Sequence, residues 1–232
     1  MIREALEYLV GLGQIKTLGI GGQTYSPEKL QLITTPAPQN IELTTLTGLI
    51  DYIDKGIDIG FHLDNIFLHV ASPTEVRVYS SLCNDATRHM FIVCKPILPK
   101  IALNIHIDIE QMNVMLQSCF VQTDDIANVL KVVGNIREEQ VQTIGDNGVS
   151  QSVVAKAGIA TVEDVNVPNP VNLAPYRSFP EIEQVESKFI LRMKSGPTAA
   201  LYEADGGIWR VEAANRIVAY LSEKMPNLKI IA

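Results

Sequence analysis

The sequence predicts an α+β protein with a mixed, mostly antiparallel sheet, packed helices and a C-terminal ββαβ unit. Segments with apolar residues at helical spacing alternate with short runs rich in β-branched and aromatic residues. Three such runs, at 66–70, 75–79 and 89–95, follow one another across short turns, as in an antiparallel meander. Because 47% of the 232 residues are hydrophobic, the chain can build an ordinary core.

Residues 1–42 are expected to form an N-terminal helix and a glycine- and proline-rich arm, followed by a single α+β domain at 43–232. Ile2, Leu6 and Leu9 recur at helical spacing at the start of the chain. The glycines that follow lack the Gly-Lys-Ser/Thr ending of a phosphate-binding loop. Thr44 is the expected N-cap of the next helix.

Two helices and a hairpin are predicted in the middle of the chain. Asp108 is the expected N-cap of a helix that buries Met112 and Met115, and Thr123 begins the caps of the next helix. Strands at 141–144 and 149–155 flank Asn147-Gly148, a strong hairpin signal. Polar residues in both strands predict a solvent-facing side or pairing with another chain.

The C-terminal unit is predicted because the spacing of its apolar residues changes from the alternation of strands to the three- and four-residue spacing of a helix. Strands at 188–194 and 198–203 are followed by Asp205-Gly206-Gly207, a long helix and a strand at 228–231. The residues expected on the buried face of this helix recur at intervals of three and four; they are Val211, Ala214, Val218, Leu221 and Met225.

Catalytic residues stay unassigned, and the sequence predicts neither a metal site nor a cofactor. The three cysteines form no C-x-x-C pair, and Cys94 and Cys119 are expected to be buried. The four histidines have no common metal-ligand spacing. No Gly-x-Ser-x-Gly nucleophile motif occurs.

Binding candidates come from aromatic residues and arginines beside glycine or proline. They are Tyr176, Arg177, Phe179, Asp205, Trp209 and Arg210. At the predicted helix start, backbone N–H groups and Arg210 could receive an anion or an acidic partner residue. The favoured alternative makes Trp209 an anchor at the edge of the core, with Arg210 directed to solvent.

Charge and hydropathy restrict the partners and the location. The net charge of −7 and the sequence pI of about 5.1 oppose direct binding of nucleic acid. The longest apolar runs are strand-sized, and no signal-peptide pattern opens the chain, so we expect no membrane contact and a cytoplasmic location.

Several segments carry a family likeness. They are GDNGVSQS (145–152), VPNP (167–170), APYRSFPE (174–181), EQ (183–184), EADGG (203–207), TLTGL (45–49) and HVASPTEV (69–76). In these the chain resembles a family of uncharacterised proteins encoded by tailed phages and prophages of Gram-positive bacteria. The resemblance covers most of the chain from about residue 43, and it implies expression in the infected host and a role in replication, recombination or host takeover.

Two functions of different class follow. The first is a non-enzymatic accessory protein that self-associates as a homo-oligomer and binds a host or phage macromolecule such as a protein. Its role would be host takeover, anti-defence or support of replication or recombination. The second is a small nucleotide-handling or metal-dependent hydrolase acting against host defence, with Asp205 or His106 among its working groups.

Overall fold

The computed structural model describes most of the chain. The described residues are 2–12, 17–20, 23–25, 38–58, 65–83, 86–134, 141–146, 151–157, 160–161, 165–167, 169–194 and 198–232. Within 18–25 and 141–167 the description covers the backbone only. The chain divides into two compact units, Met1–Ala37 and Pro38–Ala232. The predicted boundary between residues 42 and 43 stays a prediction, although β3 (Ile41–Leu43) is a strand of the larger unit.

The smaller unit contains one helix and one hairpin among its described residues. Helix α1 (Ile2–Leu12) has the amphipathic pattern that the sequence predicts, with an ion pair between Arg3 and Glu7 on its polar side. Strands β1 (Leu18–Ile20) and β2 (Gln23–Tyr25) pair antiparallel. The large apolar side chains of α1 are exposed: Ile2, Leu6, Tyr8, Leu9 and Val10.

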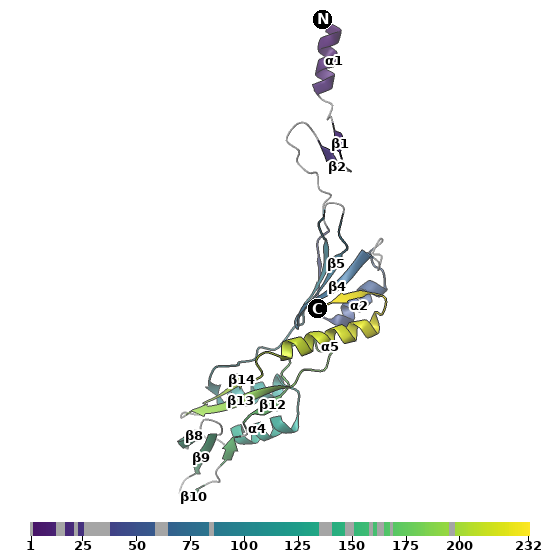
Figure 1. Cartoon of the computed structure of the whole chain (residues 1–232). Coiled ribbons are helices and arrows are strands. Elements are labelled where there is room, and N and C mark those ends of the chain that lie inside the picture. Colours follow the sequence, from purple (N-terminus) through teal and green to yellow (C-terminus); the bar gives the residue numbers. More distant parts are fainter. Residues whose placement is uncertain are drawn as a thin grey trace. The chain divides into compact units, whose positions relative to one another are not determined.

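The larger unit contains a five-stranded mixed sheet in the order β15-β4-β5-β6-β3. Figure 1 labels β4 and β5 of this sheet. Strands β4 (Ile66–Ser72), β5 (Glu75–Ser80) and β6 (Met90–Cys94) form the predicted antiparallel meander. Both outer strands, β3 and β15 (Lys229–Ile231), pair parallel to their neighbours. The α+β class is therefore confirmed.

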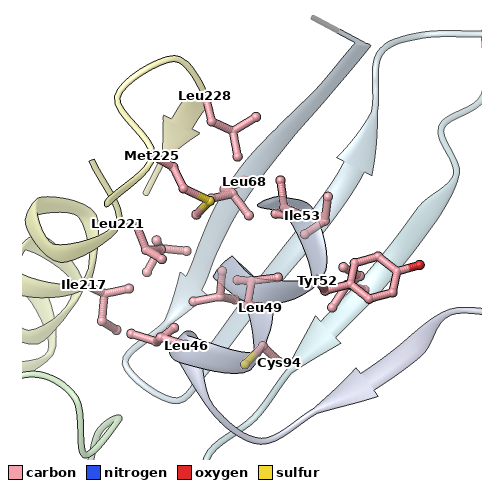
Figure 2. Packing of buried hydrophobic residues seen from close by; sticks show 14 of the residues in the cluster. Leu46, Leu49, Tyr52, Ile53, Leu68, Cys94, Ile217, Leu221, Met225 and Leu228 are labelled. Atoms are coloured by element: carbon pink, nitrogen blue, oxygen red, sulfur yellow. The ribbon is translucent and has the colours of Figure 1, made fainter. Parts of the chain in front are cut away.

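One face of this sheet packs against helices α2 (Leu46–Asp54) and α5 (Trp209–Lys224). Figure 2 shows Leu49 of α2, Leu68 of β4 and Leu221 of α5 converging in this core. All three are fully buried. Burying such a side chain contributes roughly 1.5–3 kcal/mol, so this contact is the main force that holds both helices on the sheet.

A second sheet has the order β12-β13-β14-β7 and is antiparallel throughout. Its strands are β12 (Val171–Leu173), β13 (Ser187–Lys194), β14 (Thr198–Glu203) and β7 (Ile107–Asp108). Helices α3 (Ile109–Ser118) and α4 (Asp124–Gly134) share a core with it, built around residues such as Met112, Val129 and Phe189. Asp108 and Thr123 accept the predicted N-terminal hydrogen bonds of these helices.

The predicted hairpin is present as β8 (Val141–Asp146) and β9 (Gln151–Ala157), which pair antiparallel. Strand β9 also pairs with β10 (Ala160–Thr161) and β11 (Val165–Val167). The Asn147-Gly148 turn lies outside the described residues, as do the side chains that would test the predicted solvent-facing side.

Two details differ from the sequence prediction. The N-cap of α2 is Thr45, not Thr44, because the Thr45 hydroxyl accepts the N–H of Gly48. In α5 the buried stripe runs through Trp209, Ala213, Ile217 and Leu221. Val211 is 63% exposed, because the helix has two overlapping apolar stripes and the structure buries the stripe that begins at the tryptophan.

The order β13-β14-α5-β15 matches the predicted ββαβ unit. Its strands nevertheless belong to different sheets, since β13 and β14 pair in the second sheet and β15 pairs with β4 in the first. None of the helices in the described part of the chain combines the length and apolar character needed to cross a bilayer.

Candidate functional site

Residues 174–187 form a segment that we call the connector. One cluster joins four of the six predicted binding residues: Arg177 of the connector, and Asp205, Trp209 and Arg210 around the start of α5. The connector is held in shape by the buried side chain of Gln184. Its Oε1 accepts the N–H groups of Arg177 and Ser178, each at 3.2 Å. Its Nε2 donates to the carbonyl of Phe179 at 3.0 Å. A single amide therefore satisfies several backbone groups of an otherwise irregular segment.

The connector contacts the first sheet and helix α5 as well as the second sheet. Ser178 Oγ donates to the carbonyl of Pro73, in the β4–β5 turn, at 2.6 Å. Arg216 Nη1 of α5 donates to the carbonyl of Glu183 at 3.1 Å. The isolated bridge between Phe120 and Pro175 adds the end of α3. The connector is thus the segment on which elements of both sheets meet.

Arg177 is the centre of the cluster and is 8% exposed. Its Nη1 lies 2.6 Å from Glu203 Oε1 at the end of β14, and its Nη2 donates to the Ser187 hydroxyl at the start of β13. Burial lowers the pKa of Arg177 to about 10, while Glu203 and Asp205 oppose that shift. The guanidinium therefore stays charged at neutral pH.

Trp209 carries the guanidinium of Arg177 on its ring. The Cζ of Arg177 is 3.8 Å from the ring centroid, and the Cζ of the exposed Arg210 is 4.9 Å away. Both distances are within the range of cation–π attraction, which is stronger at the desolvated Arg177. Trp209 packs with Val185 and Ala213, so it anchors the connector to the first turn of α5.

Asp205 closes the turn before α5. Its Oδ1 accepts the N–H of Gly207 at 2.9 Å, and Gly206 and Gly207 both have positive φ. Burial alone would raise the pKa of Asp205, but the Gly207 N–H, the nearby Ser187 hydroxyl and the charge of Arg177 together lower it. A Cβ at Gly207 would meet the Arg210 guanidinium, so the arginine lies against the turn.

The cluster is not fully paired. Arg177 Nε, Asp205 Oδ2 and Trp209 Nε1 are buried and have no hydrogen-bond partner of ordinary geometry among the described residues. The backbone N–H groups expected to receive an anion are used within the chain, because those of Gly207, Ile208 and Arg210 donate to Asp205 or Gly207. Only the exposed Arg210 side chain keeps the character of the predicted anion site.

The other two predicted residues lie apart from the cluster core. Tyr176 is 37% exposed. Phe179 is fully buried in the core of the first sheet. Sequence reasoning gave no role to Gln184, Ser187 or Glu203. Gln184 and Glu203 carried a signal only as members of the family-like segments at 183–184 and 203–207, and Ser187 carried none.

The remaining candidates for chemistry are separate from one another. Cys94 and Cys119 are buried as predicted, and burial raises the pKa of the Cys94 thiol to about 12. His106 stacks edge-on with Tyr202, and no interaction joins it to Asp205 in the described structure. Among the described residues, no three His, Cys, Asp or Glu side chains gather as a metal site requires.

An open pocket of about 560 Å³ lies beside α3. Its lining includes Lys100, Glu110 and Gln111, with Met115 and Cys119 among its apolar residues. Opposite charges and apolar atoms share this lining, so the pocket does not favour one class of ligand.

Comparisons of the chain with protein-family models, with curated proteins and with solved structures found no match. The family resemblance of the sequence therefore stays a prediction.

Replacing Arg177 with Met should lower the free energy of unfolding by about 3 kcal/mol, because the change removes one member of a largely buried ion pair. Urea unfolding followed by circular dichroism measures this. Arg210→Met also removes a guanidinium from the Trp209 ring, but this guanidinium is at the surface. It should lower the free energy of unfolding by less than about 1 kcal/mol. Equal losses in the two variants would contradict the central place given to Arg177.

Asp205→Asn should lower stability by about 1 kcal/mol at pH 6, because the carboxylate accepts a hydrogen bond in the folded state. A carboxylate whose folded pKa is below its ordinary value of 3.8 stabilises the fold above that value and loses this contribution as pH falls further. The difference between wild type and variant should therefore shrink below pH 4. Asp54→Asn, at an exposed position on α2, is the matched control. A difference that persists unchanged at low pH would argue against this role.

Proposed function

We propose that this chain is a non-enzymatic accessory protein of a phage or prophage that associates with a second copy of itself and binds another macromolecule inside the host cell. The biological setting rests on the family-like segments of the sequence. Self-association rests on one structural observation, the exposed apolar face of α1. The cluster around Arg177 is read as an element of stability within this proposal.

The face of α1 has the pattern of an association surface. Ile2, Leu6 and Leu9 recur at helical spacing and are 81%, 56% and 63% exposed. The helix is 11 residues long, and isolated helices of that length are marginal in water. Covering the apolar face would stabilise the helix itself, so association and helix formation support each other.

A second copy of α1 fits this face because it offers the same apolar stripe, and closed two-fold pairing is the commonest way in which identical chains associate. Each large apolar side chain buried contributes roughly 1.5–3 kcal/mol, against an association cost of about 4–15 kcal/mol. For a single short helix, the difference between the free energy gained by apolar burial and the cost of association is small. Association should therefore be reversible and depend on concentration.

Leu6→Glu combined with Leu9→Glu should shift the protein toward monomer, because both carboxylates would be buried in the α1 contact. Light scattering coupled to size-exclusion chromatography over a concentration series measures the mass directly. The matched control is Ile208→Glu with Val211→Glu, which changes two exposed aliphatic residues, one at the N-cap of α5 and one in its first turn. A monomeric wild type at all concentrations, or equal effects of both pairs, would overturn self-association through α1.

A further inference from the structure

The five-stranded sheet has a second face, opposite the face that packs on α2 and α5. Burial alternates along β4 and β5, so Leu68 and Val78 are fully buried while Phe67, His69 and Tyr79 are only half-buried. We call this second side the open face. Its described members on three adjacent strands are Phe67, His69, Glu75, Arg77, Tyr79, Lys229 and Ile231.

The strand register places aromatic rings of the open face next to one another. Phe67 pairs with Tyr79 across β4 and β5, and their rings stack with centroids 5.7 Å apart and an interplanar angle of 24°. The ring of His69 lies 6.3 Å from that of Tyr79. These rings do not belong to the core that holds the helices, and they form an aromatic row on a half-buried side of the sheet.

Cationic side chains flank the aromatic row. Arg88 lies over the ring of Phe67 at 5.1 Å, and Lys229 pairs with Phe67 from β15 and is exposed. Arg77 Nη1 donates to the Tyr79 hydroxyl at 3.2 Å. A fourth cation, Lys95, follows β6 and lies 3.7 Å from Glu75.

The acids of the same region are few. Glu75 Oε1 lies 2.7 Å from Arg77 Nε and 3.7 Å from Lys95 Nζ. The hydrogen bond from Arg77, aided by the charges of Arg77 and Lys95, keeps the pKa of the Glu75 carboxyl below its usual value. Glu42 pairs with Val93 at the far strand β3. Among the described residues of this side of the sheet and of the loops beside it, four cations outnumber two carboxylates, although two of the cations, Arg77 and Lys95, are already paired with Glu75. The local charge is positive, although the whole chain carries −7.

We propose that the open face binds single-stranded nucleic acid. Bases stack at the ends of the aromatic row, at Phe67 in place of the exposed Arg88 guanidinium that covers this ring, and the phosphates lie against Arg88 and Lys229. Sheets that present aromatic rings and cations recognise unstacked bases in this way, because every base offers a flat face to a ring. Bases within a duplex stack on one another, so only unpaired bases have a face free to stack on these rings. The sequence-based expectation against nucleic acid considered net charge alone, whereas phosphates respond to the nearby cations.

This proposal uses a surface of the larger unit and goes beyond self-association through α1. The test uses the full chain with fluorescein-labelled oligonucleotides of about 15 residues, oligo(dT) and oligo(U), because a platform of this size contacts roughly 4–16 nucleotides. Fluorescence anisotropy in about 50 mM salt should show saturable binding of at least one of them, weakening as salt rises. The two oligonucleotides decide between DNA and RNA as the natural ligand, and a duplex of the same length should bind more weakly.

Two variant pairs separate stacking from charge. Phe67→Leu with Tyr79→Leu keeps apolar side chains on the strands but removes the rings, and it should weaken binding at least tenfold. Arg88→Gln with Lys229→Gln should reduce the slope of log K against log salt by roughly 1.4, since each phosphate contact on a single strand contributes about 0.7. Thermal unfolding by circular dichroism verifies that each variant is folded.

The matched control is Lys131→Gln with Lys188→Gln, which removes two exposed lysines from α4 and β13 and should change affinity less than twofold. The Leu6→Glu and Leu9→Glu variant should still bind, so failure of self-association can be told apart from failure of this proposal. Folded wild type that binds neither oligonucleotide, equal affinity for the duplex, or equal losses in the control pair would overturn it. A protein partner on the open face would also overturn it. This result would appear as a partner that wild type binds and only the ring variant loses, while no oligonucleotide binds.

Discussion

The larger unit depends on one buried cation. The Arg177 guanidinium joins the ends of β13 and β14, through Ser187 and Glu203, to the first turn of α5, through the Trp209 ring. A charge of this kind is costly to bury, and the cost is offset only when its partners are held in place. Gln184 fixes the backbone of Arg177 itself, so the connector and the ion pair hold each other.

This arrangement explains why α5 presents the face that it does. Its N-terminal turn belongs to the polar cluster, whereas Ile217 and Leu221 pack in the core of the first sheet. A stripe with a spacing of four residues connects the two regions along one side of the helix. The large aliphatic Val211 is exposed because Trp209 occupies the position at which the helix meets the connector.

Local patterns predicted much of this fold. Features set by residues that are close in the sequence could be predicted from it. Examples are the meander, the cap at Asp108 and the buried methionines of α3. Residues that act across long separations could not be found in this way. Glu203 becomes the partner of Arg177 only when the fold brings these two residues together. A different limit applies at α2, where the backbone geometry decides which of two adjacent threonines is the N-cap, and it selects Thr45. The open face was missed for the same reason as Glu203, since Phe67 and Tyr79 are on different strands and only the register makes them neighbours.

The parallel pairing of β15 with β4 makes the first sheet discontinuous along the chain. Strands β3 to β6 precede the whole of the second sheet, and β15 returns only after it. In sequence, the second sheet with α3 and α4 is thus an insertion within the first. Loop closure costs less entropy when the intervening segment is already compact. The inserted sheet should therefore fold early, and the addition of β15, with the lysine that flanks the aromatic row, should be among the last steps of folding.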